Sequence, residues 1–115
     1  MSMDITKSLE TAMRATQARQ SAIANNIANM DTPGYRRKVV AFEDLFAKAM
    51  AADKTDPDSL QAKLTTPMDT PVDEQGNDVS VDQEMGDLVK NTAATKTYIR
   101  MLARVYRQMD QAIGG

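Results

Sequence analysis

The sequence contains neither cysteine nor histidine, and its aromatic residues are two Phe, three Tyr and no Trp. Without cysteine there is no disulfide framework and no thiolate metal site. Without histidine the chain lacks the commonest general base and the commonest metal ligand. The few aromatic side chains provide little bulky surface for a compact globular core. These absences make catalysis improbable, and the sequence predicts no catalytic residue, no cofactor and no metal.

Charge and hydropathy exclude two further classes of partner. The 14 basic and 16 acidic residues give a net charge of −2, so no basic footprint for nucleic acid or an anionic membrane is present. No apolar run approaches the roughly 18 residues that cross a bilayer. Residues 1–13 lack the basic and apolar regions of a secretory signal. We therefore expect no nucleic-acid partner, no direct lipid binding and no cleaved signal peptide.

Residues 3–30 are predicted to form one helix. Apolar or small residues recur there at alternating steps of four and three, which is the heptad pattern of a coiled-coil seam. This seam consists of Leu9, Met13, Thr16, Gln20, Ile23, Ile27 and Met30. Pro33 followed by Gly34 suits the central positions of a type II turn, which should end the helical segment.

Residues 80–113 are predicted to form a second helix, about 50 Å long. Ser80 and Gln83 have the spacing of a capping box at its start. Residues 79–82 also fit a short strand, but the capping signal outweighs that reading. The predicted seam of this helix consists of Val81, Met85, Leu88, Thr92, Thr95, Ile99, Leu102, Tyr106, Met109 and Ile113.

The two seams predict an all-α fold in which the N- and C-terminal helices pair as an antiparallel coiled coil. One register brings the four polar seam residues together, as Thr16 with Thr95 and Gln20 with Thr92, and polar seam positions specify register. In that register Leu9 faces Leu102. A helix pair of this size covers its outer faces poorly, so we expect packing against other chains. The alternative is a small bundle in which a middle helix covers the hairpin.

The segment between the helices differs from them in composition, so the chain is predicted to have three parts. Residues 1–33 form the first coiled-coil part, 34–79 the middle segment and 80–115 the second part. Within the middle segment, apolar residues on one face predict a short helix at about 42–52. Residues 53–79 carry three prolines and many polar residues, which predicts a polar loop that is flexible or ordered by a partner.

Three charged or polar clusters are interpreted as structural features and not as binding or catalytic sites. The acidic residues Asp82, Glu84 and Asp87 fit first-turn positions favoured by the helix dipole. Residues 73–78, DEQGND, have too few alternating acids for a calcium loop and predict a turn. Residues 35–38, YRRK, fit a solvated turn or the donor of an ion pair between subunits.

The stretch ANNIANMDTPGY, residues 24–35, closely resembles the N-terminal signature of bacterial flagellar axial proteins of the rod and hook class. Residues 76–98, which include GNDVSVDQEMGDLVKN, are similar to the start of the C-terminal helix of a proximal rod protein. The short middle segment also looks like that protein. The alternatives are the sister proximal rod protein and, from composition alone, a cytosolic helical adaptor or chaperone.

The resemblance implies a structural subunit of the flagellar basal-body rod, the drive shaft that transmits torque for motility. Its expected partners are other copies of itself, other rod proteins, the inner-membrane ring, rod-adaptor proteins and the flagellar export apparatus. The resemblance also implies type III export of an unfolded chain without signal cleavage. The final location is then the rod that spans the periplasm.

The asparagines of this signature raise a separate question, because asparagine is a poor residue for a helix interior. Asn25 and Asn29 point away from the predicted seam, and Asn26 flanks it. We interpret all three as outer-surface residues whose amides bind a neighbouring subunit; the alternative is that they only loosen the helix before the turn. The predicted assembly motif consists of Asn25, Asn26, Asn29, Thr32, Pro33, Gly34 and Tyr35.

Overall fold

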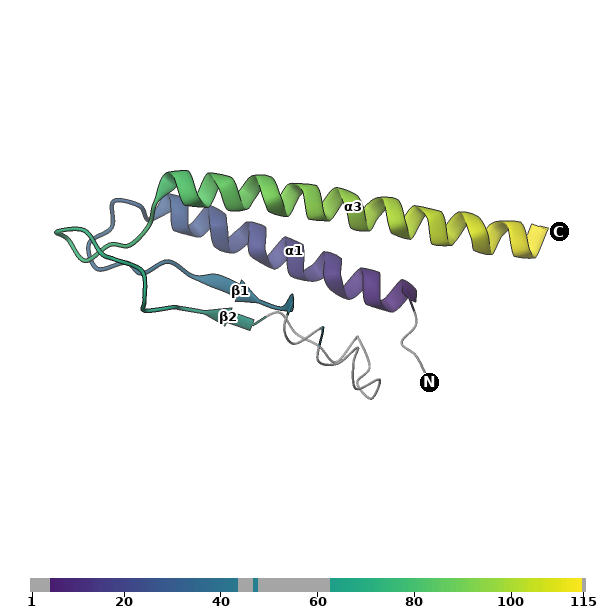
Figure 1. The fold of residues 1–115 in the computed structure, drawn as a ribbon, viewed down its shortest axis with the longest axis horizontal. Helices are drawn as coiled ribbons and strands as arrows, with labels where there is room; N and C mark the ends of the chain where they lie inside the picture. Colours follow the sequence, from purple (N-terminus) through teal and green to yellow (C-terminus); the bar gives the residue numbers. More distant parts are fainter. Residues whose placement is uncertain (1–4, 44–46, 48–62, 115) are drawn as a thin grey trace.

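The computed structural model describes residues 5–43, 47 and 63–114, and in this part of the chain two long helices dominate. Helix α1 spans Ile5–Ala28 and helix α3 spans Val81–Gly114. They run antiparallel and side by side, while strands β1 and β2 lie along the opposite side of α1 (Figure 1). The molecule is elongated, with principal extents of 64 × 26 × 15 Å. None of the described helices is long and apolar enough to cross a membrane.

The turn after α1 has the geometry that the sequence predicts. The Tyr35 backbone N–H donates to the Thr32 carbonyl at 3.2 Å, which closes a four-residue turn around Pro33 and Gly34. Gly34 has a φ of 76°, the positive value that a type II turn requires at its third position. The type II turn is therefore confirmed.

The start of α3 likewise carries the predicted cap. The Ser80 hydroxyl accepts a hydrogen bond from the Gln83 backbone N–H at 3.3 Å, and the Ser80 carbonyl accepts the first helical bond from Glu84 at 2.9 Å. These bonds satisfy donors that the first turn of a helix leaves open. The helical reading of residues 79–82 is thus correct from Val81 onward.

The middle segment contains a small sheet that the all-α prediction did not include. Strands β1 (Val39–Ala41) and β2 (Lys63–Thr65) pair antiparallel, with Val40 opposite Leu64. The helix predicted at about 42–52 falls mostly outside the described residues. Within the loop predicted over 53–79, residues 63–65 instead form a strand, whereas residues 66–79 contain no helix or strand and include the predicted turn at 73–78.

The apolar core lies between α1 and β1 rather than only between the helices. Its buried members are Ala12, Ala15, Ala22, Val40 and Phe42, with Ala18 and Tyr98 packed against them. Alanines on this face of α1 let the strand approach the helix closely. Burial of a residue such as Phe42 contributes about 1.5–3 kcal/mol. Phe42 directly follows β1, and its burial holds the end of this strand against α1.

The face of α3 turned toward α1 matches the predicted seam only in part. Leu88, Thr95 and Leu102 are partly buried, as a seam requires, but Glu84 and Asn91 are the fully buried residues of α3. The predicted seam members that are exposed in the single chain are Val81, Met85, Thr92, Ile99, Tyr106, Met109 and Ile113. The seam within one chain is therefore not confirmed at these positions, although the Tyr106 hydroxyl still donates to Glu10 Oε1 of α1 at 3.4 Å. Glu84 and Asn91 are buried because each donates or accepts hydrogen bonds at the α1 side.

Candidate assembly site

Asn26 lies at the centre of the best-defined polar site, and its side chain is 0% exposed. Its Nδ2 donates to the Lys38 carbonyl at 2.8 Å and to Glu84 Oε1 at 2.6 Å. Its Oδ1 accepts from the Tyr35 hydroxyl and from the Lys38 backbone N–H, both at 2.9 Å. A carboxamide has two donor hydrogens and two acceptor lone pairs, so Asn26 uses its full capacity. This side chain joins α1, the segment after the turn and α3.

The interpretation of the asparagines as an outer surface is therefore wrong for Asn26. Ile23 and Asn26 are three residues apart, so they share one face of the helix, and both are buried. Asn25 is exposed, as expected. Asn29 is half-buried; its Nδ2 donates to the Asn25 carbonyl at 2.8 Å, and its Oδ1 accepts from the Thr32 hydroxyl at 3.1 Å. Asn29 thus helps to end α1.

Buried ion pairs continue the site from Asn26 toward α3. Glu84 is 0% exposed; its Oε2 accepts from Nε and a terminal nitrogen of Arg37, each at 3.1 Å. Arg37 also reaches Asp87 at 3.2 Å, and its backbone N–H donates to Asp78 Oδ1 at 2.5 Å. Removing one member of such a buried pair costs about 3–5 kcal/mol, because the other charge stays buried without its partner.

Sequence reasoning missed these ionic residues. Arg36 and Arg37 were assigned to a solvated turn or to a contact between subunits, yet both pair within the chain; Arg36 Nε lies 3.1 Å from Asp78 Oδ2. Glu84 lies in the first turn of α3, as the sequence predicts, but its burial was not predicted. The available signal was composition: two adjacent arginines and a later cluster of acids, in a chain with little apolar bulk.

Tyr35 closes the outer edge of this network. Burial, followed by the charges of Glu84 and Asp78, raises the pKa of the Tyr35 phenol. The Lys38 ammonium lies 5.0 Å from the centroid of the Tyr35 ring, within the range of a cation–π contact. The phenol therefore stays a neutral donor to Asn26 Oδ1 across the physiological range.

The loop before α3 docks onto the turn after α1. The Asn77 carboxamide donates to the carbonyls of Asn29 at 2.9 Å and Thr32 at 2.8 Å. The Gly34 N–H donates to the Gln75 carbonyl at 2.8 Å. These bonds hold the loop before α3 against the residues that follow α1. Asn77 is buried, and no motif in the sequence indicated its role.

Residues 73–78 form the turn that the sequence predicts. The Asp73 carbonyl accepts from the Gly76 N–H at 3.0 Å, and the Asp73 side chain accepts from the backbone N–H groups of Gln75 and Asn77 at 2.9 Å. Gly76 has a φ of 79°, and a Cβ there would lie 3.6 Å from the Gly34 Cα. Both glycine turns therefore meet at close range.

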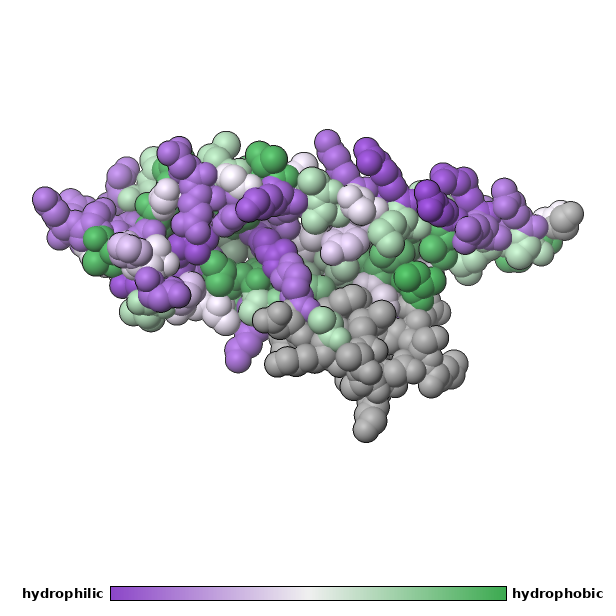
Figure 2. Space-filling model, in the orientation of Figure 1, coloured by the Kyte–Doolittle hydropathy of each residue, from purple (hydrophilic) through white to green (hydrophobic). Residues whose placement is uncertain are grey.

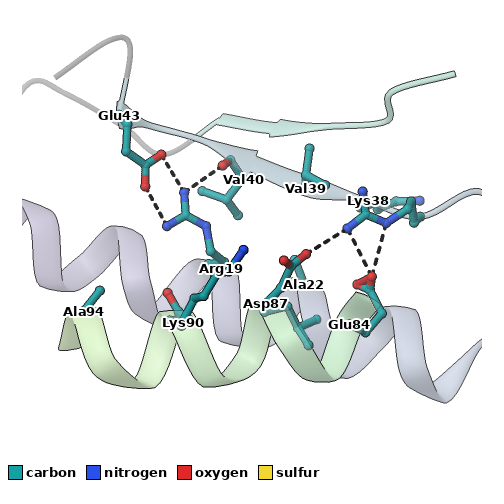
Figure 3. A pocket seen from close by; sticks show the side chains of 13 residues that line it. Arg19, Ala22, Lys38, Val39, Val40, Glu43, Glu84, Asp87, Lys90 and Ala94 are labelled. Carbon is teal, nitrogen blue, oxygen red and sulfur yellow. Dashed lines mark hydrogen bonds and ion pairs between the residues drawn. The ribbon is translucent and has the colours of Figure 1, made fainter. Parts of the chain in front are cut away.

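A cleft opens between α1, β1 and α3, with a cavity volume of about 370 Å³ (Figure 3). Arg19 extends across it from α1 and donates to the Val40 carbonyl at 3.0 Å and to Glu43 at 2.7 Å. Burial alone would raise the pKa of Glu43, but the hydrogen bond and charge of Arg19 outweigh burial and lower it. The two groups hold the end of β1 against α1.

The chemistry of this site is structural. The carboxylates of Asp78, Glu84 and Asp87 are all bound by arginine side chains. Within residues 5–43, 47 and 63–114, no group of three or more His, Cys, Asp or Glu side chains is placed to hold a metal ion. The network fixes the relation between α1, the turn and α3, and so presents one defined end of the hairpin.

Comparison with known proteins gives one family match and three named relatives. A family model described as "Flagella basal body rod protein" matches residues 7–36, which include Asn26 and the turn. The chain is similar to three proteins named flagellar basal body rod protein FlgB. The Bacillus subtilis protein is 28% identical over 120 residues, which cover 95% of this chain and 92% of the relative. The Borreliella burgdorferi protein is 32% identical over 111 residues, covering 80% and 82%, and the Borrelia hermsii protein is 27% identical over 114 residues, covering 83% and 84%.

Proposed function

The chain belongs to the FlgB family of flagellar basal body rod proteins, and we propose how its hairpin serves as a structural subunit of the proximal rod. The family is structural, it is located in the basal body, and it assembles with other rod components. All three relatives carry the FlgB name, so neither the sister proximal rod protein nor a cytosolic adaptor is favoured.

One observation carries the proposal: α3 has an apolar stripe that none of the described residues covers. Hydrophobic side chains gather along the C-terminal half of this helix (Figure 2). The exposed large apolar residues of α3 are Val81, Met85, Val89, Ile99, Met101, Tyr106, Met109 and Ile113. A surface of this kind marks an interface. Most of these residues repeat at heptad spacing, which is the pattern of a surface that packs against another helix. We therefore infer that a helix covers the stripe.

Within the rod, the predicted seam residues of α3 would therefore pack between subunits rather than inside one chain. Met85, Ile99, Tyr106 and Met109 would contact helices of neighbouring copies or of other rod proteins. Contacts between different surfaces of identical subunits produce open helical assemblies. Torque would then pass through many small packed contacts. The buried network around Asn26 would hold each hairpin rigid while it does so.

Asn25 and the exposed turn residues Thr32, Pro33 and Gly34 remain candidates for assembly contacts. They are exposed at one end of the hairpin, and the network behind them fixes their position. The inner-membrane ring and rod-adaptor proteins are the proposed partners of this end. We also propose export through the flagellar type III apparatus; the lack of cysteine supports it, because no disulfide has to form after export.

The test is a charge placed on the stripe. Ile99→Asp should leave the chain folded, because Ile99 is 49% exposed, and should lower incorporation into purified basal bodies at least tenfold. The matched control is Thr97→Asp, which places the same charge on an exposed residue about 200° around the helix. Immunoblots of basal bodies and swimming in soft agar provide the readouts. Normal motility of the Ile99→Asp strain would overturn the proposed role of the stripe.

Charges between the helices test the hairpin itself. Leu102 and Ile27 are partly buried, so Leu102→Asp or Ile27→Asp should separate α1 from α3. We expect both variants to be exported yet to fail in assembly and motility. Export is measured in the medium of a strain that secretes rod proteins. Assembly of either variant at the normal level would show that the helix pairing is dispensable.

A further inference from the structure

Asn91 has a buried acceptor that no described group satisfies. The residue is 3% exposed, and its Nδ2 donates to the Thr16 carbonyl at 2.8 Å. This bond fixes the orientation of the carboxamide, because the Thr16 carbonyl accepts only from a donor. The Oδ1 atom is buried and has no hydrogen-bond partner. A stranded buried acceptor is costly, so it marks a place where a donor belongs.

The cleft between α1, β1 and α3 is where that donor would enter. Asn91 lines the cleft together with Lys90, and the apolar part of the wall comes from Ala22, Val40 and Ala94. The labelled side chains come from both helices, from β1 and from Lys38 and Glu43 beside it, and together they line one space (Figure 3). The volume of about 370 Å³ lies within the range of about 300–1,000 Å³ for ligand pockets. It admits side chains but not a helix.

The charges of the lining restrict the chemistry of the occupant. Its three acids, Glu43, Glu84 and Asp87, are already paired with arginines. Lys90 has no ion-pair partner within 4 Å among the described residues. A cationic group would meet this positive charge, and a carboxylate could not donate to Asn91. An uncharged carboxamide satisfies both groups, because its N–H donates to Asn91 Oδ1 and its oxygen accepts from Lys90.

The free end of α3 offers this chemistry. The helix continues well past the start of α1, and every residue from 107 to 114 is exposed (Figure 1). Gln108 and Gln111 lie three residues apart in this end, so their carboxamides share one face. This end cannot reach the cleft of its own chain, because residues 94 and 111 lie about 25 Å apart along one straight helix.

We propose that the cleft receives a carboxamide of Gln108 or Gln111 from a second copy of this chain. The inference rests on the proposed function, because it names one contact through which the rod subunits join. The contact is heterologous: the C-terminal end of one α3 meets the middle of the next hairpin. Such contacts extend into a helical assembly rather than a closed dimer.

Cysteine cross-linking tests the geometry, because the chain has no cysteine of its own. Ala94→Cys with Ala112→Cys keeps both glutamines. The two sites lie about 27 Å apart within one helix, too far for a disulfide inside one chain. Oxidised basal bodies should contain disulfide-linked dimers and longer linked chains, because every subunit carries both cysteines. The control pair, Ala94→Cys with Ala103→Cys, moves the second site about 13 Å along the same helix and should give at least fivefold less dimer.

A second arm tests the chemistry within the cross-linking pair. Asn91→Leu removes the acceptor, and the double change Gln108→Glu with Gln111→Glu removes the donors; each should lower the dimer at least threefold. Gln75→Glu makes the same change at an exposed glutamine in the 73–78 turn and should leave the yield unchanged. One outcome is that basal bodies contain the Ala94→Cys, Ala112→Cys protein but no more cross-linked product than the control pair gives. That result would overturn this inference and leave the proposed function standing. If the protein is missing from basal bodies, the proposed function fails first.

Discussion

Replacing Asn26 by leucine should destabilise the folded chain more than any other single carboxamide substitution in α1. The two side chains have similar size, so the change mainly removes hydrogen bonds. Asn26 has four partners: Glu84 Oε1, the Tyr35 hydroxyl, and the N–H and carbonyl of Lys38. Tyr35 and Lys38 are only partly buried, so water can replace some of these bonds.

Glu84 is 0% exposed, so its Oε1 has no such replacement once leucine fills the site. A buried group left without a partner costs about 1–3 kcal/mol, and more when it is charged, so the expected loss is about 3 kcal/mol or more. The whole stability of a small domain is about 5–15 kcal/mol, and the thin core of this chain suggests the low end of that range. Asn26→Leu should therefore be largely unfolded, or close to it, at 25 °C.

Urea denaturation followed by far-UV circular dichroism at 222 nm measures this loss. Asn25→Leu is the matched control, since it makes the same change one residue away at an exposed position and should shift stability by less than about 0.5 kcal/mol. Equal midpoints for the two variants would refute the reasoning, because they would show that the buried hydrogen bonds of Asn26 do not support the fold.

Three further variants test the turns, α3 and the edge of β1. Gly76→Ala should cost about 1–2 kcal/mol, because Gly76 has a φ of 79°; a thermal melt no lower than that of the parent would contradict this. Gly86→Ala should instead stabilise by about 1 kcal/mol, since Gly86 lies inside α3 with nothing within 4 Å of an added Cβ, and the same melt shows the sign. Glu43→Gln tests the ion pair with Arg19. The pKa of Glu43 is lower in the folded chain than its unfolded value of about 4.5, so the pair stabilises the fold fully above that pH. This stabilisation is lost as the pH falls through the lowered folded-state pKa. The variant should show a flatter stability curve below about pH 5, and an unchanged curve would exclude the pair.

Local signals predicted the ends of the helices well. The Ser80 cap and the turn at Pro33 and Gly34 depend on a few adjacent residues, and both occur as expected. The strands were missed because each has three residues, too few for an alternating pattern to stand out. The face of α3 turned toward α1 was predicted only in part, because the heptad pattern selected apolar and small residues and passed over Glu84 and Asn91.

The candidate site was harder to predict because its residues are distant in the sequence. Nothing within α1 shows that Asn26 will meet Glu84, which lies 58 residues further on. A buried polar side chain is favourable only when its partner is present, so its burial is a property of the fold. The signature 24–35 still pointed to the correct family, since such motifs do not depend on knowing each contact.

The large separations within the polar network also set an order of events. Its bonds link residues that are 41, 47 and 58 positions apart, and Asn91 meets Thr16 across 75 positions. A chain that is delivered end first, from a ribosome or through a narrow channel, cannot complete these bonds until both distant segments have emerged. Closing such long loops is also slow compared with forming a local helix. The polar network therefore cannot form in a chain that has only partly emerged. The hairpin becomes fixed only when the last third of the sequence, which carries Asp78, Glu84 and Asn91, has emerged as well.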